Sequence, residues 1–160
     1  MSMYKSPKTD EELIGRTQKI LEQYEALELQ LCEEYFDVTL YFNCLLSLIV
    51  LPRGAKLNQL EELQVPESIK KTIKEVIDKD KGRKDINFKQ YITGLRNGVA
   101  HFGENNSLKF KNDGETITAV EITGSINKRT IQITYEFDLK NGNQLKKTVE
   151  EILKFTGYKT

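Results

Sequence analysis

The feature that most constrains this chain is a change in the spacing of its apolar residues after Gly103. Before that point the apolar residues recur at intervals of three and four, as they do along one face of a helix. Later in the chain, Ile131, Ile133, Tyr135 and Phe137 alternate with polar residues, which is typical of a strand with one buried face. The sequence therefore predicts a mainly α fold with a small β element.

The same change of pattern predicts three consecutive parts within one domain that spans residues 1–160. A helical bundle is expected over about 9–103, short antiparallel strands over about 107–138, and a closing helix over about 142–156. A chain of 160 residues fits one domain, since domains cluster at roughly 100 to 200 residues. The expected class is thus α+β, dominated by its helices.

Within the bundle the sequence predicts helices over about 9–31, 31–51, 66–79 and 88–101. The second is apolar around most of its circumference, as expected of a central helix that packs on several sides, and Pro52 ends it. Pro66 suits an early position of the third helix. Asn87 is a suitable capping residue for the fourth.

After Gly103 the predicted strands cover about 108–111, 116–123 and 130–137. Asp113-Gly114 is a strong signal for a tight turn between the first two strands. The segment Asn127–Arg129 is expected in the next turn, and Gly157 is expected to end the closing helix.

The charge balance gives a limited indication of a polyanionic partner. The chain carries 24 basic and 24 acidic side chains, so its net charge is zero, unlike that of a general nucleic-acid binder. However, residues 1–50 hold four basic and nine acidic side chains, whereas residues 51–160 hold 20 and 15. The window Lys70–Lys84 has seven basic residues against three acidic ones, which suits either a solvated face or a guide for an RNA strand.

Several other functions are disfavoured by the sequence. A single histidine excludes a His-rich metal centre within one protomer, and no cofactor is expected. Cys32 and Cys44 are expected to be buried free thiols, and with no histidine near them in sequence they make poor nucleophiles. The longest strongly apolar run, Cys44–Leu51, is far shorter than the ~20 residues that span a bilayer, so a cytoplasmic protein without membrane contact is expected.

The only histidine in the chain lies at the end of the predicted helix 88–101 and faces away from its core side. At about 100° per residue, the apolar residues of this helix gather on one face: Phe88, Tyr91, Ile92, Leu95, Val99 and Phe102. Asn97 and His101 fall on the opposite face, one turn apart, and the long side chain of Arg96 flanks them. Gly94 and Gly98 each weaken the helix by ~1 kcal/mol relative to alanine, which indicates that something approaches it closely.

These residue types suit chemistry at a phosphodiester. Histidine exchanges protons near neutral pH, and the C-terminal end of a helix favours its charged form. Arginine stays charged, can hold a phosphate through two hydrogen bonds, and stabilises charge that develops on it. Arg96, Asn97 and His101 are therefore the candidate site residues.

The segment Leu95-Arg96-Asn97-Gly98-Val99-Ala100-His101-Phe102 resembles the signature of the HEPN superfamily. In that signature an arginine is followed by a polar residue and, after four to six positions, by a histidine; here the gap is four. The segment Phe42–Leu46, in the helix that ends at Pro52, is similar to the central helix of several bacterial HEPN proteins. The resemblance covers roughly residues 10–102.

This resemblance implies a homodimer in which the two motif helices face each other, so that two copies each of Arg96 and His101 line one shared cleft. HEPN proteins that cleave RNA do so without metal, with the ribose 2′-hydroxyl as nucleophile, and many act as toxins or in defence against phage. His101 would then handle the proton on the 2′-hydroxyl or on the leaving oxygen. Arg96 would bind the scissile phosphate, and Asn97 would orient His101 or contact the RNA backbone. An antitoxin or other regulatory protein is a further expected partner.

Two other functions stay open on the sequence. A family member that keeps these residues for dimer contacts or RNA binding alone would have a similar sequence. Nucleotide binding without cleavage is also open, because no glycine-rich phosphate loop or acidic metal pair supports or excludes it. Asn43 stands in an apolar stretch, where it is expected to serve the structure or to brace the motif helix.

Overall fold

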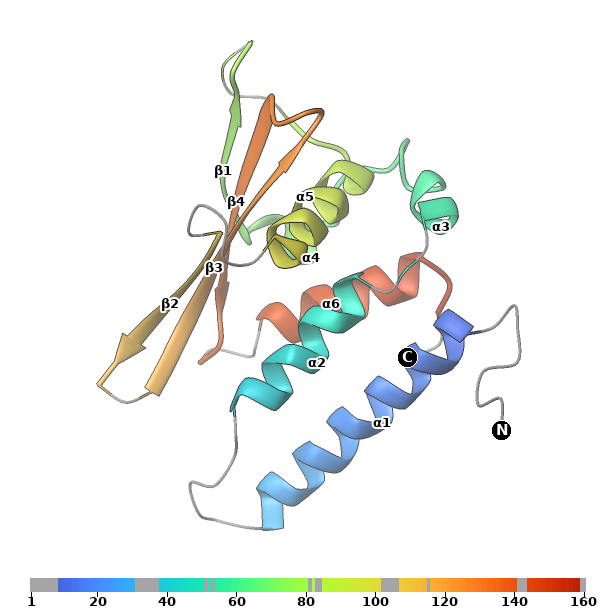
Figure 1. Cartoon of the computed structure of the whole chain (residues 1–160), viewed down its shortest axis with the longest axis vertical. Coiled ribbons are helices and arrows are strands. Elements are labelled where there is room, and N and C mark those ends of the chain that lie inside the picture. Colours follow the sequence, from blue (N-terminus) through green and yellow to red (C-terminus); the bar gives the residue numbers. More distant parts are fainter. Residues whose placement is uncertain are drawn as a thin grey trace.

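The structure is a computed structural model that describes residues 9–30, 38–50, 52, 54–80, 82, 85–101, 107–114, 116–140 and 144–158. These residues form six helices and four strands (Figure 1). In chain order the elements are α1 Thr9–Gln30, α2 Val38–Val50, α3 Gly54–Asn58, α4 Glu67–Lys70, β1 Ile73–Asp78, α5 Phe88–Ala100, β2 Leu108–Asp113, β3 Thr116–Ile126, β4 Ile131–Asp138 and α6 Gln144–Phe155.

The four strands form one antiparallel sheet in the order β1-β4-β3-β2. β4 lies inside the sheet and pairs with β3 on one side and with β1 on the other. β2 pairs with the first part of β3, and this pairing ends at Leu108 and Ile122. Every second residue of β4 is buried, as the alternating pattern predicts: Ile131, Ile133, Tyr135 and Phe137.

The prediction of a mainly α fold with a small β element is wrong, because the sheet has four strands and one of them, β1, occupies the second half of the helix expected over 66–79. Pro66 does precede a helix, but α4 has only four residues, and β1 begins soon after it. Ile73, Val76 and Ile77 are β-branched and suit a pleated surface, and pairing with β4 satisfies the backbone of this segment. The fold is mixed α+β.

The helical run expected over 31–51 begins in the structure as α2, at Val38. Residues 31–37, and with them Cys32, lie outside the described residues. α1 and α2 lie side by side (Figure 1). Cys44 on α2 is buried and free, as expected, and its burial raises the pKa of the thiol. None of the helices described here combines the length and the apolar character needed to cross a membrane.

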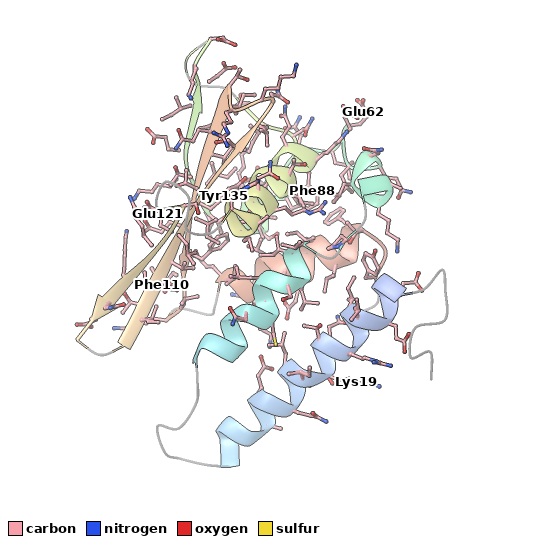
Figure 2. The ribbon with its side chains drawn as sticks, in the orientation of Figure 1. Lys19, Glu62, Phe88, Phe110, Glu121 and Tyr135 are labelled. Carbon is pink, nitrogen blue, oxygen red and sulfur yellow. The ribbon has the colours of Figure 1, made fainter. Side chains whose placement is uncertain are left out.

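The helices cover one face of the sheet in successive layers (Figure 1). α5 lies against β3 and β4, α2 packs on α5 and α6, and α1 is outermost. Figure 2 shows Tyr135 on the sheet and Phe88 on α5, and both are fully buried in the core. The rings of Tyr91 and Tyr135 meet edge to face with 5.0 Å between centroids, and Tyr135 Oη donates a hydrogen bond to the Tyr91 carbonyl at 2.6 Å. These contacts hold α5 on the sheet.

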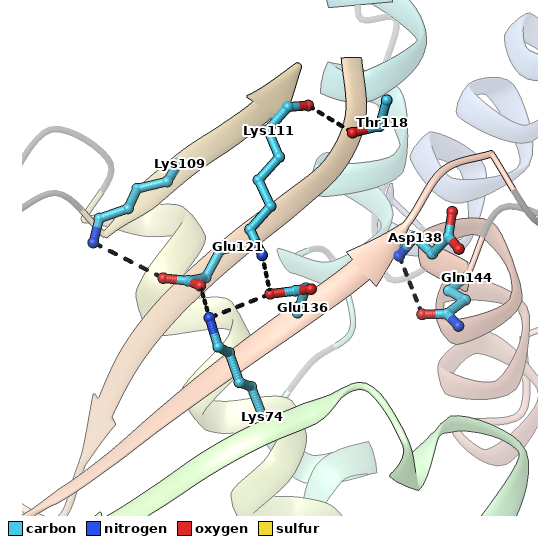
Figure 3. A network of polar contacts seen from close by, with 8 residues as sticks. All are labelled: Lys74, Lys109, Lys111, Thr118, Glu121, Glu136, Asp138 and Gln144. Atoms are coloured by element: carbon cyan, nitrogen blue, oxygen red, sulfur yellow. Dashed lines mark hydrogen bonds and ion pairs between the residues drawn. The ribbon is translucent and has the colours of Figure 1, made fainter. Parts of the chain in front are cut away.

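The other face of the sheet carries a network of ion pairs (Figure 3). Lys74 on β1 places its Nζ 2.5 Å from Glu121 Oε2 on β3 and 3.3 Å from Glu136 Oε2 on β4. Lys111 Nζ on β2 lies 2.6 Å from Glu136 Oε2, and Lys109 Nζ lies 3.9 Å from Glu121 Oε1. This face is therefore polar, which fits an antiparallel sheet that buries only one side.

Candidate functional site

The helix that carries the candidate residues, α5, has a well-defined start. The Asn87 side chain accepts a hydrogen bond from the Gln90 backbone N–H at 2.8 Å, and the Gln90 side chain accepts one from the Asn87 N–H at 3.1 Å. This reciprocal capping satisfies two N–H groups that otherwise lack partners at a helix start. The predicted cap at Asn87 is confirmed, and it sets the point from which the helix turns toward Arg96 and His101.

Glycine lets α5 pass very close to β3. A Cβ atom on Gly98 would lie 2.7 Å from Ile122 Cγ2 and 2.9 Å from the Thr123 carbonyl oxygen, and one on Gly94 would lie 2.9 Å from Ile133 Cδ1. On the strand, a Cβ atom on Gly124 would collide with the Gly94 carbonyl. The close approach expected from the helix glycines is therefore made by a strand of the same chain.

Asn97 links α5 to the last part of β3. Its Nδ2 donates a hydrogen bond to the carbonyl oxygen of Ser125 at 2.7 Å. The pairing of β3 with β2 stops at Ile122, three residues before Ser125. The Ser125 carbonyl is therefore not used by β2 and can accept the hydrogen bond from Asn97. The bond positions α5 relative to the end of β3.

His101 follows the last residue of α5 and is exposed, so it lies outside the core of its own protomer as expected. Its backbone N–H donates to the Asn97 carbonyl at 3.0 Å. Its own carbonyl accepts a hydrogen bond from Ser107 Oγ at 3.1 Å, just before β2 begins. The backbone that carries the imidazole is thus held from both sides.

Arg96 lies on a different flank of α5. Five positions separate it from His101, so the two side chains leave the helix about 140° apart. Arg96 is half-buried, and this burial lowers the pKa of its guanidinium. Burial leaves the guanidinium charged at neutral pH, because an arginine starts from a value far above 7.

Asn97 and His101 share a hollow of about 530 Å³ that runs along the end of β3. Arg96 is not among the described residues that line this hollow. The other lining residues are Lys79, Ser107, Thr123, Gly124, Ser125, Ile126, Asn127, Lys128, Arg129 and Gln132. Lys79, Lys128 and Arg129 are basic, and none of the lining residues that the structure describes is acidic. A concave surface of this charge favours an anionic ligand.

Residues 1–157 match a family described as HEPN pEK499 p136. The chain belongs to the HEPN superfamily. The resemblance carried by the segment around Arg96 and His101 is therefore confirmed for nearly the whole chain. HEPN domains are generally of the ribonuclease type, and they commonly dimerise and bind RNA. Comparisons with curated proteins and with solved structures gave no match.

Asn43 lies apart from the hollow in this HEPN protein, and the basic window 70–84 contributes one described residue to its lining. Asn43 is exposed on α2, where its carbonyl accepts a hydrogen bond from Ser47 Oγ at 2.7 Å, so it is not a buried amide that needs a partner. The described part of the basic window 70–84 is divided between α4, β1 and the residues after β1, whereas Lys81, Arg83 and Lys84 lie outside the described residues. Lys74 from this window joins the ion pairs on the outer face, whereas Lys79 lines the hollow.

Sequence reasoning did not connect Ser107, Lys128 and Arg129 with the site. The sequence predicts a turn at Asn127–Arg129, but it does not predict that this turn lies beside His101. That position depends on the pairing of β3 with β4 and on the Asn97–Ser125 hydrogen bond. The signal that could have pointed to it is the run of basic residues in a turn without glycine.

Proposed function

We propose that this HEPN protein is a metal-independent endoribonuclease that cleaves single-stranded RNA at a site formed between two copies of the chain. The observation that carries the proposal is the exposed His101, held by its backbone beside a hollow whose described lining residues include three basic side chains. Membership of the HEPN superfamily supports the reaction type.

The reaction needs one proton removed and one proton supplied. The ribose 2′-hydroxyl loses its proton to a base and attacks the adjacent phosphorus, the P–O5′ bond breaks, and the leaving oxygen takes up a proton. The products are a 2′,3′-cyclic phosphate and a free 5′-hydroxyl. A histidine can act in either role near neutral pH, so His101 would accept the proton of the 2′-hydroxyl or supply one to the leaving oxygen, and water would exchange the other proton.

The position of Arg96 supports a site shared by two copies. In one protomer Arg96 and His101 point to different flanks of α5, so Arg96 is poorly placed for a phosphate at its own His101. The exposed surface of α5 between them includes the small Ala100, which lets a second helix approach. A twofold axis here would bring the Arg96 of one copy toward the His101 of the other. The guanidinium would then bind the scissile phosphate and stabilise its developing charge.

We further propose that the protein acts on cytoplasmic RNA as a toxin or in defence against phage, restrained by an antitoxin or another regulatory protein. The support for this role is the general association of HEPN domains with toxins and defence. The chain would then depend on its partner for control of activity rather than on a cofactor.

The test is cleavage of single-stranded RNA by the full chain in the presence of EDTA. We expect EDTA-resistant cutting that both Arg96→Ala and His101→Ala abolish. Arg16→Ala is the matched control, because Arg16 is an exposed arginine on α1 that pairs with Glu12 in the same helix. Unchanged cutting by either site variant would remove the proposed mechanism.

The second candidate is a catalytically silent HEPN module that dimerises and binds RNA or a nucleotide. It is favoured by the lining of the hollow, whose described residues include His101 but not Arg96, so a ligand can bind there without a complete Arg–His pair. This candidate predicts that RNA is bound by the wild-type chain but never cut. The same EDTA experiment, run beside a binding measurement, separates the two functions.

A further inference from the structure

The hollow beside His101 extends well past the proposed catalytic residues. From Thr123 its lining follows the end of β3 into the turn that joins β3 to β4. Lys128 and Arg129 project from this turn, and Lys79 lies beyond the end of β1, all three of them exposed. Positive side chains along a groove follow the backbone of a single-stranded nucleic acid.

The backbone of this turn is unusual for the residues it contains. Asn127, Lys128 and Arg129 all have positive φ angles, of 50°, 54° and 71°. Asparagine tolerates this region, but lysine and arginine adopt it at a cost that glycine would avoid. Thr130 closes the turn, since its N–H and its Oγ1 both lie within hydrogen-bond distance of the Asn127 carbonyl, at 3.1 Å and 2.8 Å. A lysine at position 128 therefore carries a backbone cost, which a function of its side chain in the hollow would explain.

Hydrogen bonds and close packing also link the β3–β4 turn to α5, which carries His101. The Lys79 backbone N–H donates to the Thr130 carbonyl at 2.9 Å, which ties the end of β1 to the turn. Asn97 donates to Ser125, two residues before the turn, and Gly124 lies against α5. The backbone segments that carry Lys79, Lys128 and His101 are therefore linked to one another around the hollow.

We infer that the β3–β4 turn and Lys79 form a second RNA-contacting element, which holds two backbone phosphates, one at Lys128 and one at Lys79, of the RNA strand whose scissile bond lies at His101. The choice of RNA as the ligand rests on the proposed function. This RNA-contacting element would fix the position of the RNA strand along the hollow, and so determine which phosphate reaches His101.

The test measures binding without cleavage. The probe is a single-stranded RNA oligomer with 2′-O-methyl riboses, which lacks the nucleophile, and its affinity for the full chain is measured over a range of salt concentrations. We expect Lys128→Gly to weaken binding several-fold at low salt and to reduce the slope of log K against log[salt] by ~0.7, the value for one lost phosphate contact. The double variant with Lys79→Ala should reduce the slope by about 1.4.

Lys128→Gly separates binding from folding, because glycine relieves the positive φ. Its midpoint of urea unfolding should be equal to or above that of the wild-type chain. Lys19→Ala is the charge-matched control: Lys19 is exposed on α1, away from the turn (Figure 2), and its loss should leave the slope unchanged.

An unchanged slope in the double variant, or an equal fall in Lys19→Ala, would overturn the inference. So would a mononucleotide that competes with the oligomer at the same concentration, because the hollow would then be a nucleotide pocket. Failure of the proposed function has a different signature: unmodified RNA would stay intact while the salt dependence of binding still required Lys128.

Discussion

Gly124 sets how closely α5 can lie on the sheet. A Cβ atom there would collide with the main-chain carbonyl of Gly94, which no change of rotamer can move. We expect Gly124→Ala to lower the free energy of unfolding by about 3 kcal/mol, the upper end of the usual range for overpacking. The α5–β3 contact would open, and the Asn97–Ser125 hydrogen bond would be lost with it. Urea denaturation followed by circular dichroism measures the change.

Gly15 provides the matched control, because it is a helical glycine with nothing within 4 Å of an added Cβ atom. Gly15→Ala should raise the free energy of unfolding by ~0.5–1 kcal/mol, since alanine is the better helix former. Wild-type stability in Gly124→Ala would contradict the close packing of the helix on the strand.

Among the elements, the outer face of the sheet gives a prediction about pH. The hydrogen bond from Lys111, and then that from Lys74, lowers the pKa of Glu136 below its ordinary value of 4.5. A carboxyl group whose pKa is lower in the folded state stabilises the fold above pH 4.5, and this contribution is lost as the pH falls through the folded-state pKa. Glu136→Gln should therefore be less stable than the wild-type chain at neutral pH, by about 0.5 kcal/mol for a partly exposed pair.

The difference in stability between the Glu136→Gln and wild-type chains should shrink as the pH is lowered below 4.5, and thermal unfolding at several pH values measures it. Glu62→Gln is the control: Glu62 is an exposed carboxylate that lies away from the network (Figure 2), and its replacement should change stability little at either pH. A difference for Glu136→Gln that stays constant with pH would mean that the ion pairs of Glu136 with Lys74 and Lys111 (Figure 3) contribute nothing.

An element could be predicted from the sequence when the signals that determine it are local. α5 was predicted correctly because its signals are local: Asn87 and Gln90 cap it, and Phe88, Tyr91 and Leu95 follow a helical period. β1 was missed because Ile69, Ile73 and Val76 fit a helix as well as a strand. Its state depends on pairing with β4, more than 50 residues later, which periodicity within the segment does not register.

The same distinction applies to the candidate site. The position of His101 outside the core could be predicted, because it follows from its angle on one helix. The partner of Asn97 could not, since Ser125 is 28 residues away and reaches Asn97 only when β3 crosses α5. The basic turn at Lys128 was missed as part of the site for the same reason.

On the scale of the whole molecule, the layers decide which surfaces a second copy can reach. The sheet covers one side of α5 and the bundle covers another, while α1 lies farthest from the sheet (Figure 1). The surface of α5 between Arg96 and His101 is left accessible along Ala100. A dimer through this surface would pair Arg96 of one copy with His101 of the other, whereas a dimer through α1 would leave the two residues apart.

Mixed dimers test this arrangement. Arg96→Ala and His101→Ala chains with different tags can be co-expressed and the heterodimer purified. If Arg96 acts across the interface, the heterodimer keeps one of its two Arg–His pairs and should regain about half of the wild-type cleavage, although each homodimer is inactive.

The matched heterodimer joins a wild-type chain to the Arg96→Ala/His101→Ala double variant. It contains the same number of arginines and histidines at these positions, but both pairs across the interface are broken, so it should be inactive. The opposite result, with activity only where one chain carries both residues, would mean that Arg96 and His101 work within a single protomer. Because the two heterodimers differ only in how the same substitutions are distributed, a difference in activity cannot arise from a general loss of stability.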